Sequence, residues 1–360
     1  MPIAARHRTL LKWFLVGVVL GAIFQVAQAN ALGGPTGLIH AGDRHPLADL
    51  IRSELPDVAF TEGIGHDGQL FYAIGLDPLG RFVPDQMVAA ESPSYRYRRI
   101  LFPVVASLGG LLDGEALLWG MIVVSALSVG VATAAAADIA LRLGINPAVA
   151  LAVALNPGVW MSARLLTADN LALALGLAAV SALLARKETL AVVCLALAGL
   201  AKEPALAFAA GLAGYTWWSL DERKSAAATV LVPGASLLAW MAYVGWAIGN
   251  PFDASGNVVA PGAGIIAGVA RWSIVGADDI AWAVLTLVAL VVSVPLLWKA
   301  PVLWRWLTWS WVAVGLVASE LVWSVGNNAV RTLAPILTLT AMGVVHLRSN
   351  RRAAVSEAFP

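Results

Sequence analysis

The sequence has little charge and almost no cysteine. Asp, Glu, Lys and Arg make up 12% of the 360 residues, which is about half of their share in a soluble domain. Hydrophobic residues make up 59%, and the mean hydropathy is +0.79. This composition excludes a soluble globular enzyme and a disordered chain. A single cysteine, Cys194, also excludes a disulfide framework and a cysteine-rich metal site.

The motifs of soluble nucleotide-dependent enzymes are missing as well. The chain has no Gly-x-x-x-x-Gly-Lys-Ser/Thr loop and no Gly-x-Gly-x-x-Gly between a strand and a helix. It has 5 histidines, and His40 and His45 do not have the spacing of metal ligands. We therefore expect no cofactor and no metal. The net charge of +1 argues neither way about nucleic acid, and we expect no nucleic-acid partner.

Long apolar runs dominate what is present. Many approach the roughly 20 residues that cross a bilayer, and they are continuous, which excludes the alternating pattern of a membrane β-barrel. They predict an all-α polytopic membrane protein, a single transmembrane domain over residues 1–360. The expected helices, about ten in all, cover residues 10–29, 115–139, 147–163, 170–185, 189–201, 204–219, 226–248, 279–298, 302–321 and 329–347.

The region before the bundle divides into three parts. Residues 10–29 follow basic residues and end on Ala27-Gln28-Ala29, which looks like a signal-peptidase site. The run is longer than a usual signal core, so we expect an uncleaved helix. Residues 30–98 would form a large external loop with short helices. Residues 99–113 are too short to span comfortably and predict an interfacial helix.

The Lys and Arg residues set the orientation. With the bundle over residues 114–347 and a cytoplasmic tail over 348–360, the connections on one side are richer in these cations. That side holds Arg142, Arg186, Lys187, Arg223, Lys224, Lys299, Arg348, Arg351 and Arg352, whereas the other holds Arg164, Lys202, Arg271 and Arg331. The positive-inside rule then places both termini in the cytoplasm and predicts a multi-pass protein of the inner (plasma) membrane.

Unusual charges gather on the predicted outer side, where they favour a cavity or mutual pairing. Asp67 lies in Gly65-His66-Asp67-Gly68-Gln69, where glycines let a substrate approach, although Asp-Gly is also an ordinary turn. Arg96, Arg98 and Arg99 alternate with tyrosines, which suits a phosphate headgroup or an interfacial anchor.

Three further outer motifs carry charge. In the segment Arg164–Asn170, Thr167 can cap the next helix, or Asp169 can interact with the dipole at its N-terminus. Neither role explains why an arginine stands at position 164. Lys202-Glu203-Pro204 joins two short spans, so it is either a hydrophilic hairpin or a turn that dips into a cavity. Arg331 opposes the dipole of the last helix and predicts an anionic partner, structural or substrate.

Taken together these segments resemble the GT-C superfamily of integral membrane glycosyltransferases. His66 to Tyr72 is similar to the loop motif of the branch that includes the GPI mannosyltransferases and related bacterial proteins, and Ile100-Leu101-Phe102-Pro103 to its post-loop segment. The turns at Arg164–Asn170 and Lys202–Pro204 resemble the next two outer turns of that branch. Arg331 with Pro335 resembles the motif in its last helix. Many such enzymes carry paired acids in the first loop. Here Asp67 stands alone, with Glu62 five residues away.

The resemblance implies sugar transfer from a polyprenyl-phosphate donor to a glycan, lipid or protein acceptor on the extracytoplasmic face. Asp67 would be the general base. The expected substrate-binding residues are Arg96, Arg98, Arg99, Arg164, Asp169, Lys202, Glu203 and Arg331, and the possible auxiliary residues are Glu62, His66, Gln69 and Tyr72. Two alternatives stay open: a non-catalytic membrane protein of the same fold, and a transporter or flippase.

Overall fold

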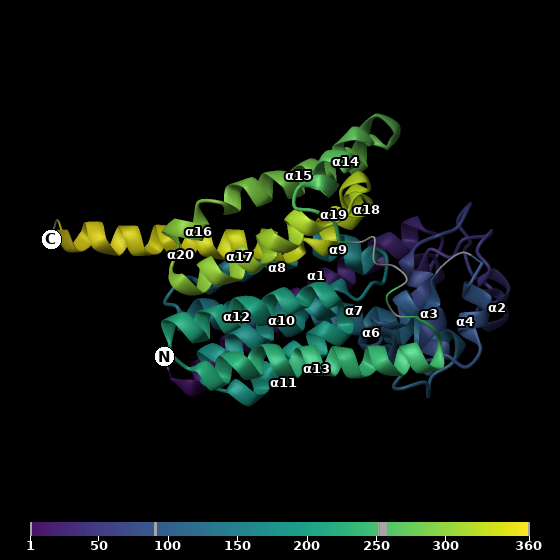
Figure 1. The fold of residues 1–360 in the computed structure, drawn as a ribbon, viewed down its shortest axis with the longest axis horizontal. Helices are drawn as coiled ribbons and strands as arrows, with labels where there is room; N and C mark the ends of the chain where they lie inside the picture. The colour runs from purple at the N-terminus through teal and green to yellow at the C-terminus, as the bar shows by residue number, and fades with distance from the viewer. Residues whose placement is uncertain (1, 90–91, 251, 253–257, 359–360) are drawn as a thin grey trace.

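The protein is all-helical in a computed structural model that describes residues 2–89, 92–250, 252 and 258–358. Within these ranges, β-structure is limited to 3 isolated bridges. Figure 1 shows most helices running along one axis, with both termini at one end and the short helices of residues 30–98 at the other. The predicted all-α class is confirmed.

Four helical stretches are long and apolar enough to cross a membrane. They are α1 (Ile3–Ala31), α7 (Gly114–Arg142), α13 (Arg223–Ala247) and Ala277–Lys299, which contains α15 (Ala277–Ser293) and α16 (Leu296–Lys299). A fifth results if α19 (Gly326–Thr332) and α20 (Ala334–Ala358), bent by 52°, count as one span. These helices are consistent with a multi-pass membrane protein.

Shorter helices fill the rest of the bundle. They are α8 (Leu151–Ala154), α9 (Pro157–Arg164), α10 (Asp169–Leu184), α11 (Glu188–Ala201), α12 (Leu206–Ser219), α14 (Ala263–Ala270), α17 (Val302–Val317) and α18 (Glu320–Ser324). The described residues also contain the short 3₁₀ helices η1 (Pro35–Ile39), η2 (Pro147–Ala150), η3 (Glu203–Ala205) and η5 (Trp272–Ile274).

The helix expected over residues 147–163 is broken into η2, α8 and α9. The break falls at Asn156, because the residue before a proline avoids the α conformation. The Asn156 side chain accepts a hydrogen bond from the Gly158 amide at 2.8 Å and donates to Ala334 O at 2.8 Å. Asn156 thus caps α9 and ties it to α20, a tertiary role that a hydropathy pattern does not reveal.

Residues 30–106 form a packed cap over one end of the bundle (Figure 1). The cap contains η1, α2 (Ala48–Glu54), α3 (Asp67–Leu76), α4 (Val83–Met87), α5 (Pro93–Tyr97) and α6 (Leu101–Ala106). Ile39, Tyr72 and Phe102 are fully buried in one cluster with Leu117 and Met121 of α7. The helix expected over 99–113 is shorter than predicted, since after α6 the chain turns through positive φ angles at Leu108, Gly109 and Gly110.

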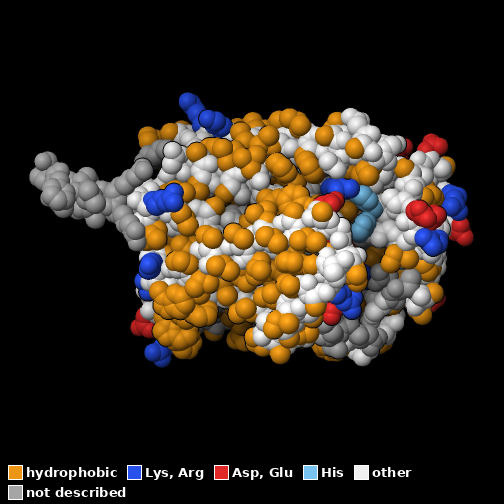
Figure 2. Space-filling model, turned by 90° about the horizontal axis from the view of Figure 1, so that it is seen from above, with side chains coloured by type: hydrophobic (Ala, Val, Ile, Leu, Met, Phe, Trp, Pro, Cys, Tyr) orange, Lys and Arg blue, Asp and Glu red, His pale blue; other side chains and the backbone are white. Residues whose placement is uncertain are grey.

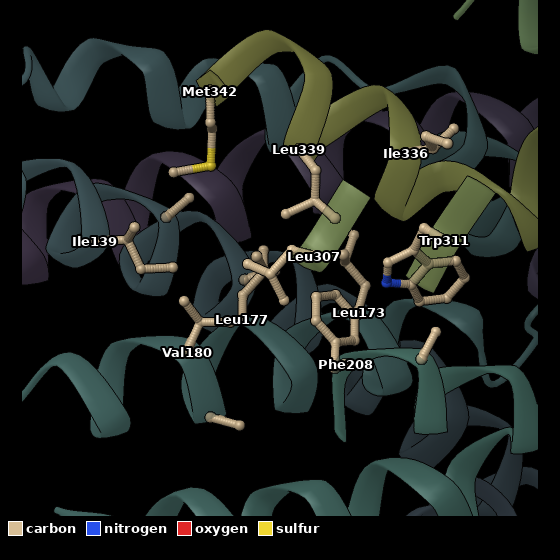
Figure 3. Packing of buried hydrophobic residues seen from close by; sticks show 14 of the residues in the cluster. Ile139, Leu173, Leu177, Val180, Phe208, Leu307, Trp311, Ile336, Leu339 and Met342 are labelled. Atoms are coloured by element: carbon tan, nitrogen blue, oxygen red, sulfur yellow. The ribbon is translucent and has the colours of Figure 1, made fainter. Parts of the chain in front are cut away.

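Large apolar side chains from many of the helices fill the bundle core. Figure 3 shows Leu173, Leu177 and Val180 of α10 facing Leu307 and Trp311 of α17 and residues of α20, with Ile139 of α7 and Phe208 of α12 beside them. On the face in Figure 2, hydrophobic side chains cover the middle of the bundle and charges gather toward the two ends. This distribution suits a chain whose middle section contacts lipid.

An ion-pair cluster lies at the end of the bundle that carries the termini. Asp138 of α7 accepts hydrogen bonds from Arg6 Nε of α1 at 2.8 Å, Arg142 Nε at 2.8 Å and Ser181 Oγ of α10 at 2.6 Å. Asp138 and Arg142 lie four residues apart on one helix face and form an ion pair. These contacts fasten α1 and α10 to α7.

Candidate functional site

Asp67 is the first residue of α3, at the junction between cap and bundle. The two glycines near it are required by packing. A Cβ on Gly65 would lie 2.3 Å from His40 O, and one on Gly68 would lie 2.6 Å from Leu165 O. Gly65 also has a positive φ of 69°. The glycines therefore let α3 sit against η1 and the end of α9, and the space beside them is filled by backbone rather than left for a substrate.

The Asp67 carboxylate lies between two arginines from distant segments. Arg96 Nη1 of α5 donates to Oδ1 at 3.0 Å, and Arg331 Nη2 of α19 donates to Oδ2. The three side chains are only 10–18% exposed. Burial alone would raise the pKa of Asp67, but the charges of Arg331 and Arg96 outweigh it and hold that pKa well below its usual value. Asp67 is thus an ionised, poorly basic carboxylate while these pairs persist.

A second ion pair lies in the turns after α9 and α11. Lys202 Nζ donates to Asp169 Oδ1, and it also donates to Thr332 Oγ1 at 3.2 Å. Thr167 does not cap α10 with its side chain. Instead its hydroxyl donates to Asp169 Oδ2 at 2.8 Å. The Lys202 side chain is 10% exposed and that of Asp169 is 7% exposed, so this pair is nearly enclosed.

The third group is an arginine cluster around Tyr95 and Glu203. Glu203 Oε2 accepts from Arg99 Nε at 2.9 Å, and its Oε1 lies 3.3 Å from Arg98 Nε. The guanidinium carbons of Arg98 and Arg99 lie 4.5 and 4.7 Å from the Tyr95 ring centroid, within cation–π range. Burial would raise the pKa of Glu203, but Arg99 and Arg98 lower it overall.

Arg164 differs from the other cations of the site. Its Nε is buried without a hydrogen-bond partner, and no acidic side chain of the described residues forms an ion pair with it. Its charge acts on His40 and His66, whose rings meet edge to face at 5.5 Å. Burial, then His66 and Arg164, lower the pKa of His40 to about 4. Arg164 is therefore a cation without a counterion among the described residues, in a site where the pKa values of His40 and His66 are lowered.

The three groups form one cluster at the cap–bundle junction. Arg331 acts electrostatically on both Asp67 and Asp169, and Arg99 on both Asp67 and Lys202. A small cavity is lined by Asp169, Lys202 and Arg331 on its polar side and by Phe208 and Trp311 on its apolar side. Figure 2 shows basic, acidic and histidine side chains at the border between the apolar middle and the cap.

The balance of charge in this cluster is positive. Its basic members are Arg96, Arg98, Arg99, Arg164, Lys202 and Arg331, and its acidic members are Asp67, Asp169 and Glu203. These nine side chains carry a net charge of +3. A multivalent anion such as a phosphate is the chemical complement of such a site.

The auxiliary residues proposed from sequence separate into those near the cluster and those away from it. Glu62 is not part of it: its side chain is 92% exposed and lies 4.0 Å from Arg44. Gln69 is structural, since its Oε1 accepts from the Gly42 amide and its Nε2 donates to Ile64 O. Tyr72 is buried in the cap core. His66 precedes Asp67 and lies beside His40.

Sequence reasoning missed His40, Thr332 and Asn328. Asn328 Oδ1 accepts from Arg331 Nη2 at 2.8 Å and helps to orient that guanidinium. His40 has a left-handed φ of 48°, and no pattern in the neighbouring sequence predicted this conformation. In the described ranges, no three His, Cys, Asp or Glu side chains are placed to hold a metal ion.

Comparison with models of protein families, with curated proteins and with solved structures gives no match for this chain.

Proposed function

We propose that this protein is a membrane glycosyltransferase that moves a sugar from a polyprenyl-phosphate donor to an acceptor on the extracytoplasmic face. The observation that carries the proposal is the cluster of net charge +3 at the cap–bundle junction, which includes Arg164 with no described acidic partner. A partly buried cation such as Arg164, which has no acidic partner among the described residues, is costly unless an anion completes the site. The GT-C resemblance of the same segments adds support.

The proposed topology requires more membrane-spanning helices than the four or five that are long enough by themselves. Adding α10, α11, α12 and α17, which have 14–16 residues, to the five spans gives nine, and counting the broken segment η2–α8–α9 as one more crossing gives the ten that put both termini in the cytoplasm. A helix of 14 residues is about 21 Å long, shorter than the roughly 30 Å of a hydrocarbon core. Short α11 and α12 would therefore set Lys202 and Glu203 below the outer surface, where a lipid-linked phosphate lies.

The cavity beside Lys202 and Arg331 has a volume of only about 10 Å³, which is room for about one water molecule, so a donor would bind there only after the surrounding side chains move apart. Its cations would bind the phosphate, whereas Phe208 and Trp311, which line its apolar side, are buried in the bundle core. Both cations are engaged by acids in this structure, Lys202 by Asp169 and Arg331 by Asp67. A donor phosphate would take the place of these carboxylates, and the exchange would detach Asp67 from Arg331.

That exchange would also activate the base. Once Arg331 and Arg96 turn to the phosphate, the pKa of Asp67 rises toward the ordinary range, because their charges are what lower it. Asp67 then accepts the proton of the acceptor hydroxyl while that oxygen attacks the anomeric carbon. The bond from that carbon to the phosphate oxygen breaks, and its electron pair leaves with polyprenyl phosphate. A single in-line displacement of this kind inverts the anomeric centre.

A transfer assay on purified protein in lipid tests the proposal, with a radiolabelled polyprenyl-phosphate sugar as donor. Asp67→Asn should reduce turnover by at least about 100-fold, since a positioned base contributes about 10²–10⁴-fold. Glu62→Gln is the matched control, because Glu62 is an exposed acid of the same cap outside the cluster. Full activity of a folded Asp67→Asn protein would eliminate Asp67 as the base.

The same assay separates the alternatives. If the unmodified protein transfers sugar from no polyprenyl-phosphate donor, a non-catalytic membrane protein of the same fold replaces the enzyme. If the labelled donor instead crosses the bilayer of proteoliposomes intact and only when the protein is present, a flippase replaces it.

A further inference from the structure

A large apolar groove lies far from the candidate site, at the end of the bundle that carries the termini. It has a volume of about 600 Å³, within the range of small-ligand pockets. Figure 1 shows α12 between α13 and α17, and the groove follows this junction. Small residues form its floor, namely Ala210, Ala213, Gly214, Ala226 and Ala227.

Three tryptophans wall the groove. Trp218 of α12 and Trp306 of α17 stack at 4.7 Å, and Trp217 lies 6.2 Å from Trp218. A Cβ on Gly214 would lie 2.4 Å from the Trp306 ring, so glycine is what admits the Trp306 ring so close to α12. Trp218 is 69% exposed within the structure. Tryptophan rings in this position are typical of the boundary between acyl chains and headgroups.

The rim of the groove carries charges of both signs, with Arg223 and Lys224 as its cations. The Arg223 guanidinium lies 5.5 Å from the Trp217 ring centroid, and Lys224 follows it in the first turn of α13. The acids nearby are Asp221, which is 88% exposed and 3.7 Å from Arg223, and Glu222, which is bound by Arg186 at 2.8 Å. Among the described residues, the ion pair that Arg223 forms is long and solvent-exposed, so its guanidinium can also contact a second anion.

We propose that this groove binds an anionic phospholipid, with one acyl chain between α12 and α13 and the headgroup phosphate at Arg223 and Lys224. The apolar walls match the acyl chain, the tryptophans match the boundary between chain and headgroup, and the two cations match the phosphate. The proposal requires only that the chain lies in a bilayer. It is independent of the proposed sugar transfer, because no residue of the groove belongs to the outer cluster.

Native mass spectrometry tests this on the full chain, with equal amounts of phosphatidylglycerol and phosphatidylcholine that carry the same acyl chains. The wild-type protein should retain phosphatidylglycerol preferentially. Arg223→Ala with Lys224→Ala should weaken its binding by about 30-fold, which corresponds to about 2 kcal/mol at about 1 kcal/mol per cation. Arg44→Ala with Arg52→Ala is the matched control, since it removes two exposed arginines from the cap at the other end.

A second variant tests the acyl chain. Ala227→Trp fills the floor of the groove and should weaken the binding of both lipids while leaving Arg223 and Lys224 intact. Millimolar inorganic phosphate should not displace phosphatidylglycerol, because the acyl chain of the lipid supplies much of the binding free energy. Equal retention of the two lipids by the wild type, equal losses in both double variants, or displacement by phosphate without any effect of Ala227→Trp would each overturn the proposal.

Discussion

Replacing Asp67 with asparagine is expected to weaken the ligand-free protein and, at the same time, to tighten its hold on a phosphate. The Asp67 carboxylate is shared by Arg96 and Arg331, whose side chains are 18% and 10% exposed. Asparagine keeps the shape and one acceptor oxygen but removes the charge. Two nearly buried guanidinium groups would then lose their shared counterion.

The size of the first effect follows from burial. Breaking a buried ion pair by removing one partner costs about 3–5 kcal/mol. Because the three groups keep some solvent contact and the amide keeps one acceptor, the lower end of that range applies. We expect a loss of about 3 kcal/mol of stability, visible as a melting temperature lower by several degrees. Glu62→Gln, at a 92% exposed side chain, should change stability by no more than about 0.5 kcal/mol.

The second effect has the opposite sign. In the wild type a phosphate must displace Asp67 from Arg331 and Arg96, whereas in Asp67→Asn these two guanidinium groups no longer share its carboxylate. Recovering even half of the lost pairing energy, about 1.4 kcal/mol, would tighten binding tenfold. Calorimetric titration of a short-chain prenyl phosphate into both proteins measures this. An Asp67→Asn protein with the melting temperature of the wild type and an unchanged or weaker affinity for phosphate would refute the idea that the Asp67 carboxylate occupies the phosphate site in the ligand-free protein.

Four further outcomes are expected. Lys202→Ala should weaken donor binding and turnover together by at least about tenfold, because a phosphate contact acts in both the ground and the transition state, and a change in KM alone would contradict this. Asp138→Ala should lower stability by about 3–5 kcal/mol in thermal melts, since its two arginine partners lose their shared carboxylate, yet sugar transfer at a permissive temperature should persist. His40 is kept neutral with a pKa of about 4 against 6.5, so the unfolded chain binds the extra proton between these values. Stability should therefore be complete above pH 6.5 and fall by up to about 3 kcal/mol toward pH 4, and His40→Asn, which tolerates the left-handed backbone, should flatten that slope. Finally, in a Cys194→Ala background, a cysteine placed beside Arg186 should react with an impermeant reagent only from the cytoplasmic side, and labelling from outside would invert the topology.

Local patterns were sufficient for the helical class and for contacts within one helix. Continuous apolar runs predicted the helices, because hydropathy acts on each segment alone. The Asp138–Arg142 pair is likewise local, because residues four apart lie on one face of a helix. The pattern was less able to say where helices break. The break at Asn156 has a local cause in Pro157, whereas the hydrogen bonds of the Asn156 side chain to α20 depend on residues far along the chain.

The sequence by itself determined which residues are unusual, since an ionisable side chain beside an apolar run is conspicuous in one dimension. It thereby marked Asp67, Lys202 and Arg331 as candidates. Only the tertiary structure decided which of these charged side chains form ion pairs with each other. Asp67 and Arg331 are 264 residues apart, and Glu62, the nearest acid in sequence, lies outside the cluster while the unmarked His40 lies beside it. The physical reason is that composition and periodicity are local, whereas the neighbours of a buried charge are set by how the cap packs on the bundle.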